Sequence, residues 1–66
     1  MIKLGEHCWY YTGDPIVTYA AHYDRDAGDG THRIVVTLEN GSHTAIVAAE
    51  CDPAKPQAGC WSVVPA

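Results

Sequence analysis

Apolar and polar residues alternate along much of this chain with a period of two, which is typical of half-buried β-strands. The segments expected to form strands are residues 6–11, 16–23, 32–39, 42–49 and 60–64. Glycine and proline separate these segments, and no stretch shows the 3.6-residue period of a long helix. The pattern therefore predicts an all-β fold of five short strands.

The segments between the strands have the composition of turns and loops. Residues 12–15 read Thr-Gly-Asp-Pro, which favours a turn, because proline cannot sit in a central strand. Residues 24–30 are expected to form a polar loop, and residues 51–59, which contain two prolines, an ordered loop. In the second strand, alternation assigns one face to Val17, Tyr19, Ala21 and Tyr23.

The strongest local signal is Asn40-Gly41, between the third and fourth expected strands. A two-residue type I′ turn needs positive φ at both central residues, which Asn and Gly tolerate. Such a turn would place Leu38 opposite His43 and Ile34 opposite Val47. The core face would then carry Ile34, Val36, Leu38, Ala45 and Val47, and the other face Arg33, Val35, Thr37, Thr44 and Ile46.

The size of the chain limits the architecture. Its 66 residues suffice for one domain, which we expect to span residues 1–66. The simplest arrangement is a small five-stranded SH3-like barrel with a tight hairpin at Asn40-Gly41, and an open sheet of three or four strands is the alternative. Domains this small bury only about 60% of their unfolded surface. A disulfide, a metal or a partner therefore usually stabilises them.

The charge argues against two classes of partner. The formal net charge is −4, and Lys and Arg together number only 4. Nucleic-acid binding draws much of its affinity from neutralised phosphates, so neither DNA nor RNA is an expected partner. No apolar run approaches the roughly 20 residues that span a bilayer, and no secretory leader is visible at the N-terminus. We expect no membrane partner and a protein made in the cytoplasm.

The three cysteines, Cys8, Cys51 and Cys60, do not form a closed disulfide framework, because their number is odd. Reduced thiols are the expectation for a cytosolic protein. Cys51 and Cys60 flank the proline-containing loop and could form a bridge if the protein leaves the cell. The spacing alone does not decide between these alternatives.

No metal, cofactor or catalytic site is predicted. Asp24, Asp26 and Asp29 share one loop, but they lack the ligand spacing and flanking helices of a calcium-binding EF-hand. The histidines and cysteines form no close pair such as C-x₂-C or H-x₃-H, which structural zinc sites contain. No nucleophile, base and orienting group are marked as converging. We therefore expect a protein that is not an enzyme.

Aromatic and branched residues lie on both faces of several expected strands. Trp9 and Tyr11 fall on the face opposite Cys8 and Tyr10. A half-buried sheet should alternate more cleanly, so a second apolar face indicates contact with another chain. Tyr and Trp are also enriched at interface hot spots. The predicted interface residues are Trp9, Tyr11, Val35 and Ile46, and Ile46→Asp should abolish assembly without unfolding the domain.

Two parts of the chain resemble known proteins. Residues 4–11, Leu-Gly-Glu-His-Cys-Trp-Tyr-Tyr, followed by residues 15–21, resemble the opening of SH3-like barrels. The hairpin of residues 34–47 and the closing Gly59-Cys60-Trp61 with Pro65 are similar to short proteins from the structural gene modules of tailed bacteriophages. The three cysteines depart from that pattern.

The resemblance implies a virion component, such as a capsid decoration, minor capsid or tail-associated protein, assembled in the bacterial cytoplasm. Its partners would be capsid or tail proteins, or further copies of itself. The alternative is a cytoplasmic bacterial interaction module or small inhibitor that binds a single protein. The acidic balance of the chain would suit an inhibitor of a basic protein.

Overall fold

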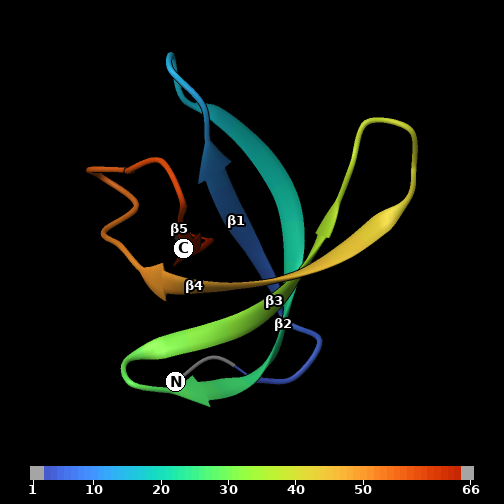
Figure 1. Cartoon of the computed structure of the whole chain (residues 1–66), viewed down its shortest axis with the longest axis vertical. Helices are drawn as coiled ribbons and strands as arrows, with labels where there is room; N and C mark the ends of the chain where they lie inside the picture. Colours follow the sequence, from blue (N-terminus) through green and yellow to red (C-terminus); the bar gives the residue numbers. More distant parts are fainter. Residues whose placement is uncertain (1–2, 65–66) are drawn as a thin grey trace.

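The computed structural model describes residues 3–64, which form a closed five-stranded barrel (Figure 1). The strands are β1 (His7–Thr12), β2 (Val17–Gly28), β3 (Thr31–Thr37), β4 (His43–Glu50) and β5 (Cys60–Val63). No helix occurs between residues 3 and 64. The predicted all-β class is confirmed, and the architecture is consistent with a small SH3-like barrel.

The first four strands form an antiparallel meander, and β5 closes the barrel between β1 and β4. β5 runs antiparallel to β1, where three residue pairs form the ladder. It runs parallel to β4, and only Ala49 with Cys60 and Glu50 with Trp61 pair there. The β4–β5 seam is therefore the shortest ladder of the barrel.

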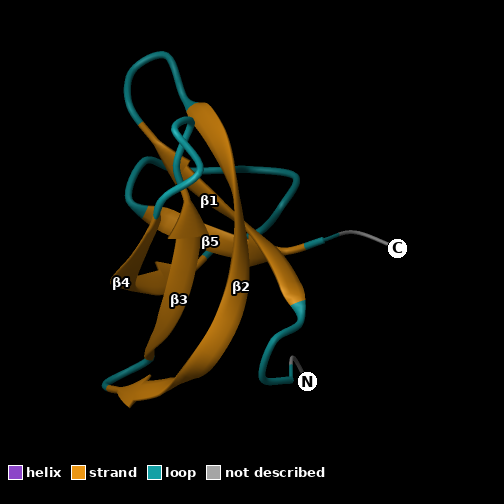
Figure 2. Cartoon of the chain, turned by 90° about the vertical axis from the view of Figure 1, so that its right-hand side faces the viewer, coloured by secondary structure: helices purple, strands orange, loops and turns teal. Residues whose placement is uncertain are grey.

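β2 is longer than the sequence pattern predicted, and Figure 2 shows it as a long curved strand. Tyr19, Ala21 and Tyr23 face the core, as the alternation predicted, whereas Val17 at the strand's start is 47% exposed. The expectation of a polar loop over residues 24–30 is wrong, because the strand continues to Gly28 through two irregularities in its pairing with β3. β-bulges of this kind let a strand bend while its polar side chains stay in solvent.

The two-residue turn of this protein lies at Asp29-Gly30. Gly28 pairs with Thr31, so only these two residues form the loop between β2 and β3. Asp29 has φ 54° and Gly30 has φ 76°, the positive values that a type I′ turn requires at both central positions. Asp-Gly is a favoured sequence for this turn.

The register predicted between β3 and β4 is wrong by one residue. Ile34 pairs with Ile46 rather than with Val47, and Thr37 pairs with His43. The loop holds one residue more than a two-residue hairpin, since the amide of Leu38 donates to the carbonyl of Ser42. The amide of Gly41 donates back to the carbonyl of Leu38, and Gly41 has φ 85°. This is the three-residue loop in which a left-handed glycine follows a turn.

The shifted register exchanges the faces of β4, because successive side chains of a strand point to opposite sides. Ile46 and Ala48 lie on the core side, and Val47 is 57% exposed. Ala45 and Leu38, which were also expected in the core, are exposed. Ile34 and Val36 are buried as predicted.

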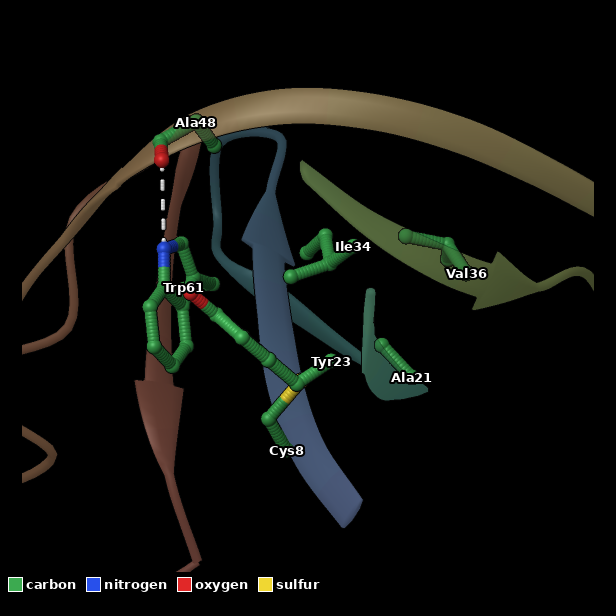
Figure 3. Packing of buried hydrophobic residues seen from close by; sticks show 7 residues of the cluster. All are labelled: Cys8, Ala21, Tyr23, Ile34, Val36, Ala48 and Trp61. Atoms are coloured by element: carbon green, nitrogen blue, oxygen red, sulfur yellow. Dashed lines mark hydrogen bonds between the residues drawn. The ribbon is translucent and has the colours of Figure 1, made fainter. Parts of the chain in front are cut away.

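The core is centred on Trp61, which is fully buried (Figure 3). Its indole nitrogen donates a hydrogen bond of 3.1 Å to the carbonyl of Ala48, which joins β5 to β4 inside the barrel. The ring of Tyr23 packs 5.7 Å from the Trp61 ring. The other buried members of this cluster are Cys8, Ala21, Ile34, Val36 and Ala48. Trp61 is the largest fully buried side chain between residues 3 and 64, so β5 supplies the largest piece of the core.

Candidate interaction surface

The structure does not bring the four predicted interface residues together on one exposed face. Trp9 and Val35 lie on the outside of the barrel and are half-buried. Tyr11 is buried, and Ile46 packs against the core from the inner side of β4. Trp9 and Val35 thus stay available as surface residues, whereas the face assignment of Ile46 was wrong.

Tyr11 does point away from the main core, as the alternation predicted, but it is covered. Its side chain is only 5% exposed, and its hydroxyl lies 2.7 Å from the Oγ of Ser62. The amide of Gly59 donates to the carbonyl of Tyr11, so the end of the 51–59 loop runs along this part of β1. Tyr11 is therefore a structural residue at the β1–β5 junction.

A row of side chains crosses the outside of β1 to β4. His7 pairs with His22, His22 with Val35, and Val35 with Ala45. His43 flanks this row, with its ring centroid 6.4 Å from that of His22. Three of the four histidines of the chain therefore lie on the same outer face as Val35.

The outer face of β3 and β4 continues into a hollow beside the bulged end of β2. The hollow is a shallow depression open to solvent, with a volume of about 600 Å³, and is lined by Arg25, Asp26, Ala27, Arg33, Ala45 and Val47. Four of its lining residues belong to β2 and β3, whose connecting hairpin forms the lower left of the view in Figure 1. Its position follows from the extra length and the bulges of β2, because a loop over residues 24–30 would not present Arg25 beside β3.

Two cationic side chains meet at this hollow. Arg25 lies directly opposite Arg33 in the β2–β3 ladder, and together they are half of the Lys and Arg residues of the chain. Like charges in directly opposed positions destabilise a sheet unless other groups offset them. Arg33 is offset, since its Nε lies 3.2 Å from Oδ2 of Asp24. Arg25 has no ion-pair partner within residues 3–64.

The largest apolar side chain of the hollow is Val47, which pairs with Arg33 across the strands. A valine that is 57% exposed in the middle of a strand leaves its methyl groups in water. The hollow thus combines an exposed apolar side chain with guanidinium groups that bind carboxylates well. Sequence reasoning missed Val47 and Arg25, because the predicted register placed Val47 in the core and the predicted loop contained Arg25.

Tyr23 and His32 form a polar pair beside the core. The Tyr23 hydroxyl lies 2.8 Å from Nδ1 of His32, and the His32 ring stands edge-on to Trp61 at 5.3 Å. Burial raises the pKa of Tyr23, and the charges of Asp26 and Glu50 raise it further. A raised pKa keeps the phenol of Tyr23 neutral, so this side chain is suited to hydrogen bonding and not to acting as a general base. We interpret this pair as a structural link between β2 and β3.

All three cysteines carry free thiols. Cys8 is 1% exposed, and burial, with a smaller contribution from Glu6, raises its pKa to about 11. A thiol so rarely deprotonated at neutral pH is a poor nucleophile. Cys51 and Cys60 are half-buried. Burial raises the pKa of Cys60, and the neighbouring Cys51 thiol adds to this through its charge and a side-chain hydrogen bond.

Metal ligands do not cluster within residues 3–64, where no three His, Cys, Asp or Glu side chains are placed to share an ion. In the same part of the chain, no helix is long and apolar enough to cross a membrane.

No protein-family model matches the chain, and neither a curated protein nor a solved structure shows significant similarity to it. The resemblance to phage structural proteins therefore stays a prediction.

Proposed function

We propose that this protein is a non-enzymatic assembly subunit that binds a larger protein through the hollow beside β2, β3 and β4. The observation that carries the proposal is the exposed Val47 beside the opposed Arg25 and Arg33. Arginine is enriched at protein interfaces and their hot spots, and covering the exposed valine beside it removes apolar surface from water.

The hollow favours a partner segment that presents a carboxylate next to an apolar side chain. The carboxylate would approach Arg25, whose charge is not paired within residues 3–64. The apolar side chain would cover Val47 and Ala45, whose side chains are exposed to water in the isolated barrel. Covering them would remove apolar surface from water, which favours binding. Asp26 also lines the hollow and would repel an acidic group placed on its side, which fixes the orientation of the partner.

We propose a bacteriophage virion as the setting, with capsid or tail proteins as partners. The support is the resemblance of residues 34–47 and 59–61 to short phage structural proteins, together with a small closed barrel. The alternative is a bacterial inhibitor of a single protein, which would use the same hollow but bind one enzyme.

Site-specific cross-linking tests the proposal. A photoreactive amino acid replaces Val47 in one variant and Val17 in the matched control, which is also an exposed valine in a strand. Each purified variant is irradiated in a lysate of the source cells, and the adducts are identified by mass spectrometry. We expect adducts of a capsid, portal or tail protein at position 47 that are at least about tenfold more abundant than at position 17.

A second variant, Val47→Asp, tests whether the captured partner depends on the hollow. Val47→Asp places a carboxylate opposite Arg33, where it forms a cross-strand ion pair and repels an acidic partner. We expect it to lose the captured partner while keeping the melting temperature of the parent. An enzyme captured at position 47 would favour the inhibitor instead. Equal labelling at positions 47 and 17 would show that the hollow is not the interface.

A further inference from the structure

The thiols of Cys51 and Cys60 are neighbours across the seam that closes the barrel. Cys60 pairs with Ala49 at the parallel junction of β4 and β5, and the amide of Cys51 donates a 2.7 Å hydrogen bond to the carbonyl of Trp61. Cys51 follows β4 directly and lies two residues beyond Ala49, the partner of Cys60, so the two cysteines are diagonal neighbours at the end of this ladder. The Cys51 thiol is near enough to Cys60 to contribute to the raised pKa of Cys60.

The connection between the two cysteines is held in place rather than free. The amide of Lys55 donates to the carbonyl of Asp52, and the amide of Cys60 donates to that of Gln57. The amide of Gly59 is bound to Tyr11 of β1. The fold therefore fixes the positions of both cysteines at the end of the β4–β5 seam.

Cys8 cannot take part in the same chemistry. It is 1% exposed and belongs to the core cluster around Trp61, whereas Cys51 and Cys60 are half-buried and reach solvent. A small oxidant therefore reaches only two of the three thiols.

We propose that Cys51 and Cys60 are a built oxidation site and form an intramolecular disulfide with a low-molecular-weight disulfide, such as oxidised glutathione, as the oxidant. The thiolate of one cysteine attacks the oxidant, forms a mixed disulfide and releases one small thiol. The thiolate of the second cysteine then attacks the protein sulfur of that mixed disulfide, and the second small thiol leaves. Two electrons pass to the oxidant, and its two released thiols take up the two protons.

The bond would act at the shortest ladder of the fold. Only two residue pairs join β4 to β5, and the buried Trp61 depends on that junction. A covalent link at residues 51 and 60 would hold β5 against β4 even when the ladder opens. It would also restrict the unfolded chain, which is how a disulfide stabilises in the loop-entropy description.

The test uses the full chain, fully reduced and then equilibrated with oxidised glutathione. We expect the free thiols to fall from three to one, a mass loss of two hydrogens and no retained glutathione. Peptide mapping should place the bond between residues 51 and 60. The melting temperature should rise by about 10 °C, as estimated for a short closed loop in a domain of this size.

Two variants make the outcome decisive. Cys8→Ala should fall from two free thiols to none and show the same rise in melting temperature. Cys51→Ser should keep a glutathione adduct on Cys60 and show no rise. Three free thiols after oxidation, a persistent glutathione adduct on the parent chain or a disulfide-linked dimer would each overturn the proposal. None of these results depends on the hollow or on the proposed function.

Discussion

The hydroxyl of Tyr11 and the Oγ of Ser62 are 2.7 Å apart, although 51 residues separate them in the chain. Ser62 is fully buried and Tyr11 nearly so, and the bond joins β1 to β5 on the outside of the main core. Ser62 Oγ also lies 3.1 Å from the carbonyl of Val63, to which it donates. A serine that donates to Val63 accepts from the tyrosine, so both hydroxyls are satisfied.

A double-mutant cycle on this pair should show strong coupling. Tyr11→Phe and Ser62→Ala should each lower the free energy of unfolding by about 1–2 kcal/mol, because each removes one hydroxyl and leaves the other buried without this partner. The double variant should cost about as much as the costlier single change, since no unpaired hydroxyl remains. Urea unfolding of the four proteins measures this, and strictly additive losses would show that the hydroxyls do not interact.

Ile46 and Val47 are adjacent in β4, yet aspartate should affect them in opposite ways. Ile46→Asp should cost about 3 kcal/mol, because it brings a charge against the core and removes an isoleucine opposite Ile34. That loss is close to the whole stability expected of so small a domain. Val47→Asp should change stability by no more than about 0.5 kcal/mol.

Circular dichroism and thermal melts of the two variants distinguish the two registers of the β3–β4 hairpin. In the register first predicted from Asn40-Gly41, Val47 would face the core and Ile46 the solvent. A folded Ile46→Asp and an unfolded Val47→Asp would support that register and contradict the structure.

Gly30→Ala should destabilise the β2–β3 hairpin. Gly30 has φ 76°, and a β-carbon added there would meet nothing within 4 Å, so the expected loss of about 1–2 kcal/mol comes from the backbone alone. Glu39→Ala, in the β3–β4 loop, is the control and should stay within about 0.5 kcal/mol of the parent. Chemical denaturation compares the two, and a neutral Gly30→Ala would argue against positive φ at this position.

The buried thiol of Cys8 should make stability fall at alkaline pH. Its pKa is about 11 in the folded protein, against 9.0 for an unperturbed thiol, so the folded state keeps a proton that the unfolded state releases. The stabilisation is complete below about pH 9 and is lost as the pH rises from 9 to 11, by roughly 2 kcal/mol.

Comparison with Cys8→Ala isolates this contribution, because Tyr23 and Cys60, whose pKa values are also raised, titrate in both proteins. Urea unfolding in the presence of a reductant, at pH 8.5 and pH 11, gives the change in the free energy of unfolding with pH for each of the two proteins. Parallel decline of parent and variant would remove Cys8 as the cause.

The sequence predicted the strands well, because alternation of apolar and polar residues is a direct signal for a barrel with one buried side. The predicted segments 6–11, 42–49 and 60–64 each agree with the observed strands to within one residue at either end. The inward face of β2 was also correct from Tyr19 to Tyr23.

The loops were harder to predict, because one short motif fits more than one geometry. Gly41 has positive φ in the observed three-residue loop, as it would in a two-residue turn, so Asn40-Gly41 signals either. The run from Asp24 to Asp26 is polar enough for a loop, and only its pairing with β3 shows that it belongs to a strand. The hollow depends on both of these features, so it could not be predicted from local patterns.

The short β4–β5 seam also bears on the order in which we expect the strands to fold. The hairpins of β1 to β4 join neighbours in the chain, whereas β5 meets β1 only after a closure of about 50 residues, which is entropically slower. We expect the meander to assemble first and β5 to dock last, bringing Trp61 into an otherwise unfilled interior. A chain truncated before residue 60 would then form four strands around an incompletely filled core.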